Sequence, residues 1–280
     1  MNRRNFLLTP ALAAAASAQQ TKTPGGTGKL KQCVCGSVFP RGLSLEQRCA
    51  IAAKMGFVGY DLLDPKDWPT VKKQGLVPSL ATGTGMTIAN GINRVENHDK
   101  FEKSTHELID VAAKEGVTDI ILLSGERKGM SDQEGLENCV KFLNKVKKHA
   151  EEKKVTLVTE LLNSKVDHPD YMCDHTVWGV EMCKRVDSPS VKLLYDIYHM
   201  QIMEGDIIRT IRKNFQYLGH FHTAGNPGRH EMDDSQEMNY KGIAKALVDL
   251  NYQGYIAHEY SPLKDALTSL EQTKKMFEVV

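Results

Sequence analysis

Residues 155–160 (VTLVTE) form a short apolar, β-rich segment that ends on a carboxylate, and three later segments likewise end on Asp, His or Glu. They are VKLLYD at 191–196, YLGHFH at 217–222 and YIAHE at 255–259. A longer amphipathic segment lies between each of these and the next. Strands that alternate with helical segments indicate βα units and a parallel sheet.

The same alternation extends back to residue 31 and predicts eight strands, each followed by a helix. This count favours an α/β fold of the (β/α)8 or TIM barrel type, as a single domain over residues 31–280. An open doubly wound sheet would usually have fewer strands and a glycine-rich phosphate loop after the first one. The predicted strands are 31–35, 59–63, 76–81, 118–123, 155–160, 191–196, 216–222 and 255–259. The predicted helices are 44–55, 64–75, 99–115, 131–154, 171–186, 204–213, 240–250 and 263–277.

The composition is that of an ordinary globular protein. The chain has 280 residues, of which 41% are hydrophobic and 25% are charged, and an α/β barrel takes roughly 250 residues. Lys and Arg number 36 against 35 Asp and Glu, which leaves a formal charge of +1. This balance weighs against a protein that binds nucleic acid mainly by electrostatic attraction.

Residues 1–18 have the features of a bacterial export signal. Arg3 and Arg4 precede an apolar stretch, and Ala16-Ser17-Ala18 matches a small-x-small cleavage site. Paired arginines followed by Phe-Leu are typical of the twin-arginine type. We therefore expect an export signal over 1–18, a linker over 19–30 and a periplasmic mature protein. A short amphipathic helix is the alternative.

No membrane span is expected, because no apolar run reaches the roughly 20 residues that cross a bilayer. The six cysteines show no C-x-x-C spacing, so a zinc ribbon or a redox motif is not indicated. An exported protein can form disulfides, but small buried hydrophobes are the favoured reading of these side chains. The cysteines are Cys33, Cys35, Cys49, Cys139, Cys173 and Cys183.

The last four predicted strands each end on a potential metal ligand: Glu160, Asp196, His222 and Glu259. Barrel enzymes place their chemistry at the C-terminal ends of the strands. Three carboxylates converging there would repel one another unless a cation neutralised them. The set is rich in hard oxygen donors and favours Mn²⁺ or Mg²⁺, with Zn²⁺ or Co²⁺ as alternatives. One such carboxylate by itself would more often be a helix N-cap.

Polar residues that follow these strands are candidates for contacts with a substrate. The principal ones are Asn163, His199 and Arg229. Gln201, His230 and Glu231 lie in the same loops.

Several ordered motifs resemble the hydroxypyruvate isomerase family, within the xylose isomerase-like barrels. They are LYDIYHMQ at 194–201, MEGD at 203–206, GHFH at 219–222, PGRHE at 227–231, EMNY at 237–240 and HEYSP at 258–262.

The resemblance implies that Glu160, Asp196, His222 and Glu259 bind the metal and that the two glutamates transfer protons. It also implies that His199 and Arg229 hold substrate oxygens. A cation beside a carbonyl and an adjacent hydroxyl acidifies the C–H between them and stabilises an enediolate. For hydroxypyruvate, the reaction would give tartronate semialdehyde.

Three positions depart from the family pattern and leave the substrate open. His222 stands where the compared isomerases often carry Gln, and His is typical of sugar epimerases. Ser261 replaces a common Lys, which would bind an anionic carboxylate, and Gly225 replaces a frequent acidic residue. The substrate is thus hydroxypyruvate, an uncharged sugar, a keto-sugar or a sugar acid.

Other functions remain as alternatives to an aldose–ketose isomerase. An epimerase, or a lyase or hydratase acting on oxidised sugars, would use the same metal site, whereas a non-catalytic barrel would only bind a sugar. The related DNA-repair endonuclease barrels need a richer zinc cluster and a basic groove, which the net charge argues against. The sequence is also compatible with a homo-oligomer.

Overall fold

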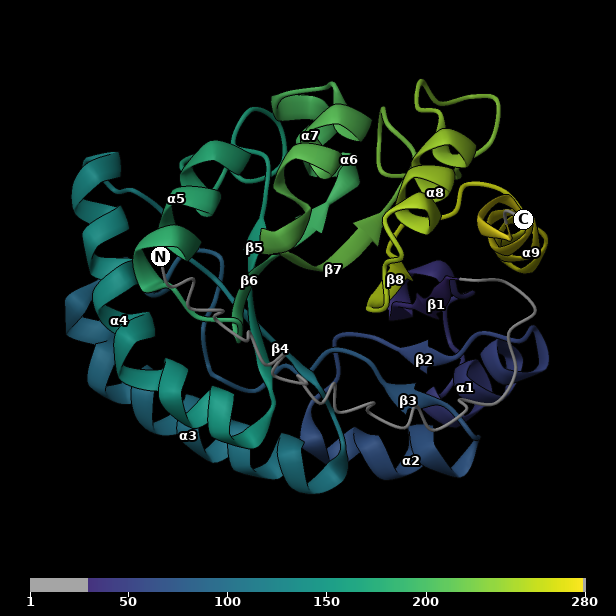
Figure 1. Ribbon diagram of the computed structural model, residues 1–280. Helices are drawn as coiled ribbons and strands as arrows, with labels where there is room; N and C mark the ends of the chain where they lie inside the picture. The colour runs from purple at the N-terminus through teal and green to yellow at the C-terminus, as the bar shows by residue number, and fades with distance from the viewer. Residues whose placement is uncertain (1–29, 279–280) are drawn as a thin grey trace, which may run out of the picture.

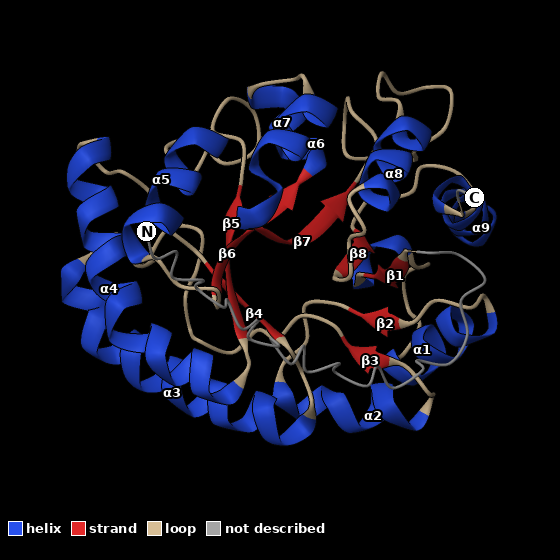
Figure 2. Cartoon of the chain, in the orientation of Figure 1, coloured by secondary structure: helices blue, strands red, loops and turns tan. Residues whose placement is uncertain are grey.

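The chain winds eight parallel strands into a barrel, with the helices packed around the outside (Figures 1 and 2). The computed structural model describes residues 30–278, so the expected signal and nearly all of the linker lie outside the described residues. The hydrogen-bonded order of the strands is β3-β2-β1-β8-β7-β6-β5-β4. The strands are β1 (Lys31–Val34), β2 (Gly59–Tyr60), β3 (Val77–Pro78), β4 (Asp119–Leu122), β5 (Thr156–Leu161), β6 (Val191–Asp196), β7 (Leu218–Thr223) and β8 (Tyr255–His258).

The two ends of this sheet meet through one bridge just beyond β3. Ala81 pairs in parallel with Ile120 of β4. The Ala81 amide donates to the Asp119 carbonyl at 2.9 Å, and the Ile121 amide donates to the Ala81 carbonyl at 3.1 Å. These bonds close the ring of strands, and the predicted TIM barrel fold with a single domain is confirmed.

Two of the predicted helix starts are set by serine caps. The Ser44 hydroxyl accepts from the Gln47 amide at 3.2 Å, and the Gln47 side chain accepts from the Ser44 amide at 2.9 Å. Ser131 accepts from the Glu134 amide at 3.2 Å. The α-helices are α1 (Leu45–Lys54), α2 (Trp68–Lys73), α3 (His98–Glu115), α4 (Asp132–Lys153), α5 (Thr176–Val186), α6 (Ile197–Met203), α7 (Ile207–Asn214), α8 (Tyr240–Asp249) and α9 (Ala266–Phe277).

The second and third predicted strands are too long. β2 ends at Tyr60 instead of residue 63, and Leu62 adopts a left-handed backbone with φ of 57°, which interrupts an extended strand. β3 ends at Pro78 instead of residue 81. Proline has no amide hydrogen to donate to a strand ladder.

Two predicted helices are also wrong in their bounds. The helix expected over 171–186 begins at Thr176, because the residues before it form a loop on the barrel. In that loop the Tyr171 hydroxyl donates to the Glu160 carbonyl at 3.1 Å and accepts from the Ser124 amide at 3.0 Å. The helix expected over 204–213 is α7, and α6 before it was not predicted. Left-handed backbone at Gly205 and Asp206 separates the two.

The principal core lies between the strands and the surrounding helices. Buried residues such as Leu157, Leu193 and Phe221 on the strands belong to one cluster with Phe142 and Leu247 on the helices. None of the described helices is long and apolar enough to cross a membrane. In such a barrel the C-terminal ends of the strands are the place where a polar site is expected.

Candidate metal and substrate site

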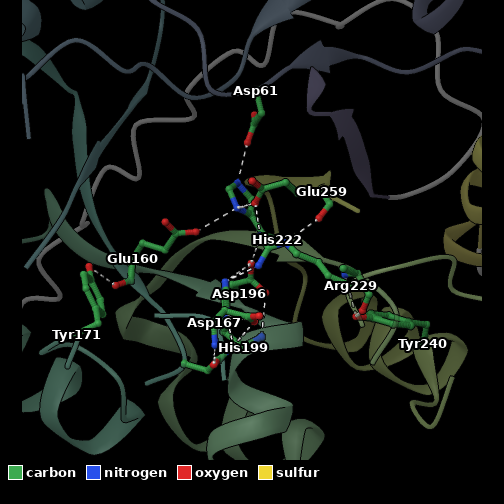
Figure 3. Close-up of polar contacts among 12 residues, drawn as sticks. Asp61, Glu160, Asp167, Tyr171, Asp196, His199, His222, Arg229, Tyr240 and Glu259 are labelled. Atoms are coloured by element: carbon green, nitrogen blue, oxygen red, sulfur yellow. Dashed lines mark hydrogen bonds and ion pairs between the residues drawn. The ribbon is translucent and has the colours of Figure 1, made fainter. Parts of the chain in front are cut away.

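The four predicted ligands meet at the C-terminal end of the barrel. Glu160 lies in β5, Asp196 ends β6, His222 lies in β7 and Glu259 follows β8. One oxygen or nitrogen from each lies within 4.8 Å of those of the other three, as Figure 3 shows. The strand register produces this meeting, since Asp196 pairs with His222, which also pairs with Ala257 of β8.

The ring of His222 has one engaged nitrogen and one free nitrogen. Nε2 lies 3.0 Å from the Asp61 carboxylate. Nδ1 lies 2.9 Å from Glu259 Oε2 and 3.3 Å from Glu160 Oε1. Within residues 30–278, Nδ1 is nevertheless fully buried and has no hydrogen-bond partner. A buried ring nitrogen that faces two carboxylates and has no hydrogen-bond partner fits a shared cation.

The carboxylates of this group have unlike surroundings. Burial raises the pKa of Glu160, and the nearby charges of Glu259 and Asp196 raise it further. Burial would also raise the pKa of Glu259, but His222 and Arg229 outweigh it and lower that pKa. The two glutamates are thus unequal as proton donors and acceptors, which suits a pair that works as acid and base.

The carboxylates around His222 change the pKa of its imidazole. Burial alone would lower the pKa of the imidazole, but Glu259, Asp61 and Glu160 raise it well above its usual value. The cluster therefore attracts positive charge strongly, and a divalent cation can supply that charge in place of a proton.

Asp196 is both a helix cap and a member of the cluster. Its Oδ1 accepts from the His199 amide at 3.1 Å and so begins α6. Its Oδ2 lies 3.1 Å from Arg229 Nη2. The capping interpretation of a carboxylate after a strand therefore applies to this residue, and Asp196 also belongs to the four-residue group.

Arg229 reaches into the site from the loop after β7. Its Nη2 lies 2.7 Å from Glu259 Oε2, and its guanidinium lies over the Tyr198 ring at 5.1 Å. Gly225 allows this loop to turn back, since a Cβ there would lie 2.1 Å from the Glu231 carbonyl oxygen. An acidic side chain at position 225 is therefore incompatible with the loop as it is built here.

His199 is fully buried between Asn163 and Arg229, and the structure brings all three predicted substrate residues together. Burial and the Arg229 charge lower the pKa of His199 well below its usual value. The Asn163 amide nitrogen lies 2.6 Å from His199 Nδ1, and its oxygen accepts two backbone amides of the loop. Asn163 thus orients His199 and has its own polar atoms occupied.

Three other polar residues of these loops have structural contacts instead. Gln201 donates to Glu237 at 3.2 Å. Glu231 accepts from the amides of Leu263 and Lys264, both at 2.7 Å. His230 lies against the Ser261 carbonyl at 2.8 Å.

A buried network that was not predicted from the sequence lies beneath the cluster. His220 Nε2 lies 2.8 Å from Asp61 Oδ2, and its Nδ1 lies 3.0 Å from Asp119 Oδ2. One signal was present: His220 and His222 are two residues apart on a strand and therefore share a face. Asp61 is also a carboxylate within an otherwise apolar segment.

Cys35 was read only as a small buried hydrophobe, and it also lies at the site. All six cysteines are buried and free, in agreement with the prediction. However, Cys35 Sγ groups within 4.8 Å of ligand atoms of His222 and Glu259. Burial and the Glu259 charge raise the pKa of this thiol well above its ordinary value.

Among curated proteins, the chain is 38% identical to a Danio rerio protein named "Putative hydroxypyruvate isomerase". That match covers 41% of this chain and only 42% of the relative. A 2-oxo-tetronate isomerase of Haemophilus influenzae is 26% identical over 81% of this chain and 92% of its own length.

Among solved structures, a family 2 AP endonuclease from Brucella melitensis matches with a TM-score of 0.78 and 24% identity. The match covers 86% of this chain and 96% of the other. A D-psicose 3-epimerase of Clostridium cellulolyticum matches with a TM-score of 0.73 and 19% identity, over 89% of this chain and all (100%) of the other. These two likenesses show the fold.

The model of the family described as "Xylose isomerase-like TIM barrel" matches residues 49–276, which include all four clustered residues. With the closed barrel and this cluster at its C-terminal end, the match leads to one conclusion: the chain belongs to the xylose isomerase-like TIM barrel family.

Proposed function

We propose that this protein is a metal-dependent aldose–ketose isomerase acting on a small hydroxy-carbonyl compound. One observation carries the proposal: three carboxylates converge on the free Nδ1 of a buried histidine. Removing a histidine nitrogen from water without a partner costs free energy, and a bound cation would offset that cost. The relatives named as isomerases support the reaction class.

The donor set favours one Mn²⁺ or Mg²⁺ ion. Glu160, Asp196 and Glu259 supply hard oxygens, and His222 supplies one nitrogen. Cys35 lies beside the group and keeps Zn²⁺ or Co²⁺ as alternatives, since thiols prefer softer ions.

We assign each site residue a role from its position. Glu160 and Glu259 lie 3.3 and 2.9 Å from His222 Nδ1, and we assign them the removal and return of the substrate proton. A bound divalent cation would acidify the C–H next to a carbonyl and stabilise the enediolate. Arg229 and His199 would hold substrate oxygens.

Hydroxypyruvate is the first candidate substrate, with tartronate semialdehyde as its product. The step moves a proton from one carbon to its neighbour and needs no redox partner. A related keto-sugar or sugar acid would undergo the same proton transfer. Sugar epimerisation is the second candidate, favoured by His222 at the position where the isomerases often carry Gln. A keto-sugar lyase or hydratase and a non-catalytic sugar-binding barrel are the remaining outcomes to test.

A substrate panel in D₂O tests the proposal. The purified protein with Mn²⁺ or Mg²⁺ is incubated with hydroxypyruvate, ketohexoses and 3-keto-sugars, and products are followed by NMR. We expect deuterium at the carbon next to a carbonyl, together with an isomerised product for one substrate. Inversion at one carbon would identify an epimerase, and loss of water or cleavage a hydratase or lyase. No conversion and no deuterium with any compound would reject the isomerase.

We also propose that the protein is exported to the periplasm by a twin-arginine signal over residues 1–18, which the N-terminal sequence supports. Fractionation of cells that express the full chain tests this, with Arg3→Lys/Arg4→Lys as the comparison. Protein that remains in the cytoplasm for both chains would reject export.

A further inference from the structure

A column of buried charged groups runs through the barrel beneath the proposed metal site. Asp119 of β4, His220 of β7, Asp61 after β2 and His222 of β7 contact one another in that order. The successive distances are 3.0, 2.8 and 3.0 Å. Figure 3 shows the end of the column nearest the site; in that view Asp61 lies above the His222 ring, and Glu160 and Asp196 lie below the ring.

The hydrogen bonds fix where the protons are. Both ring nitrogens of His220 lie against a carboxylate oxygen, and an ionised carboxylate can only accept. Both nitrogens must therefore donate, which makes His220 an imidazolium. Asp61 also accepts from the Ser79 hydroxyl, so three donors surround this single buried carboxylate.

The same reasoning reaches His222. Its Nε2 faces Asp61 Oδ2 and must carry the hydrogen, because Asp61 has none to give. In a neutral imidazole the other nitrogen then carries the lone pair. That nitrogen is Nδ1, which faces Glu160 and Glu259.

Stability alone does not account for these charges. The interior of such a barrel is usually filled with branched apolar side chains. Buried ion pairs are often no more stabilising than apolar residues of similar volume, because charges lose their hydration on burial. A column of alternating charge that ends on the one histidine of the cluster is better explained by what it does to that histidine.

We propose that Asp61 is a positioning residue that sets which nitrogen of His222 faces the metal, and that His220, held by Asp119, holds the Asp61 carboxylate in place. The inference rests on the proposed function only in taking a divalent cation as the ligand of Nδ1. Partners behind a metal-bound histidine commonly change metal affinity about 10- to 100-fold when they are replaced.

The first experiment measures Mn²⁺ affinity by electron paramagnetic resonance in wild type, Asp61→Asn and Asp61→Leu. The Asn variant removes the charge, and the Leu variant removes the acceptor while keeping a side chain that branches at Cγ. We expect the affinity to fall about 10-fold or more in both variants. Asp174→Asn is the matched control, because Asp174 is equally buried but contacts Arg127, Ser164 and His175. Its affinity should equal that of wild type. Folded Asp61 variants with wild-type affinity would overturn the proposal.

The second experiment needs no substitution of Asp61. Protein labelled with ¹⁵N in histidine is loaded with diamagnetic Mg²⁺ or Zn²⁺, and the His222 signals are identified by their loss in His222→Gln. We expect a hydrogen on Nε2 that is protected from exchange with water, and none on Nδ1. A hydrogen on Nδ1, or a bare Nε2, would overturn the assignment even if the Asp61 variants fail to fold.

The two readouts separate this inference from the proposed function. If wild type binds no Mn²⁺, the metal-dependent isomerase fails. A protected Nε2 hydrogen in metal-free protein that disappears in Asp61→Leu would still support the control of His222 by Asp61. If the protected Nε2 hydrogen remains in Asp61→Leu, the proposal that Asp61 orients His222 is rejected.

Discussion

His222 is held between Asp61, 3.0 Å from its Nε2, and Glu259, 2.9 Å from its Nδ1. The contact with Asp61 is a hydrogen bond, whereas Nδ1 bonds to nothing among the described residues. The site thus has one nitrogen with a fixed partner and one presented to the mouth of the barrel. The predictions below follow from this asymmetry and from the groups around it.

The two glutamates should be needed for turnover beyond their share of metal binding. Glu160→Gln and Glu259→Gln keep the side-chain volume but remove the proton-transfer group, so we expect kcat to fall about 10²- to 10⁴-fold. Steady-state kinetics at saturating Mn²⁺ measure this, with Glu204→Gln, a carboxylate outside the cluster, as the comparison. Full activity in both site variants would remove them from the mechanism.

Substitution of Arg229 or His199 should change the kinetics with the substrate more than the affinity for the metal. Each hydrogen bond to a charged group is worth about 1.5–3 kcal/mol, so Arg229→Lys should lower kcat/KM roughly 10- to 100-fold. His199→Gln should also lower kcat/KM, because its ring lies against Arg229. Kinetics with the substrate identified by the panel provide the check. An unchanged kcat/KM in both variants would show that neither residue touches the substrate.

Removing the metal should lower the melting temperature. A ligand at about 100 times its Kd adds roughly 2.7 kcal/mol of stability, which corresponds to about 5–10 °C for a chain of this size. Differential scanning fluorimetry with EDTA, and then with excess Mn²⁺, measures the difference. Glu160→Gln/Glu259→Gln serves as the control and should show a much smaller difference. Equal melting temperatures in wild type would argue against a metal bound by the folded state.

His258 should make the fold sensitive to acid. It is fully buried between Thr223 and Gln32, and burial lowers its pKa from 6.5 to about 3. Between these pH values His258 binds a proton in the unfolded chain but not in the folded chain. The stability contributed by the neutral ring is therefore complete above pH 6.5 and is lost as the pH falls towards 3.

Urea unfolding at pH 7, 6 and 5 measures this effect. The free energy of unfolding of wild type should fall more steeply than that of His258→Gln, by up to about 1.4 kcal/mol per pH unit. Replacing the exposed His175 by Gln should leave the wild-type slope. Equal slopes for His258→Gln and wild type would contradict the assignment.

The sequence predicted the parts of this molecule that depend on local pattern. The four clustered residues were found because each lies at a strand end, and a parallel barrel brings all strand ends to one face. Ser44 and Ser131 marked helix starts because their caps involve residues only three positions away.

The parts that were missed depend on contacts between distant residues. Asp61 meets His220 across 159 positions and Asp119 meets His220 across 101, and no periodicity in one segment shows such a pair. Cys35 looked like core because strand cysteines usually are, and only the closed barrel brings it to Glu259. The helix expected from residue 171 failed for a similar reason, since Tyr171 bonds to other strands and loops.

The central claim is that Glu160, Asp196, His222 and Glu259 bind one divalent cation. Calorimetric titration of the metal-free mature protein with Mn²⁺ tests it most directly. We predict one Mn²⁺ per chain in wild type and little or no binding in Glu160→Gln/Glu259→Gln. No binding in wild type, or the same binding in both proteins, would contradict the claim.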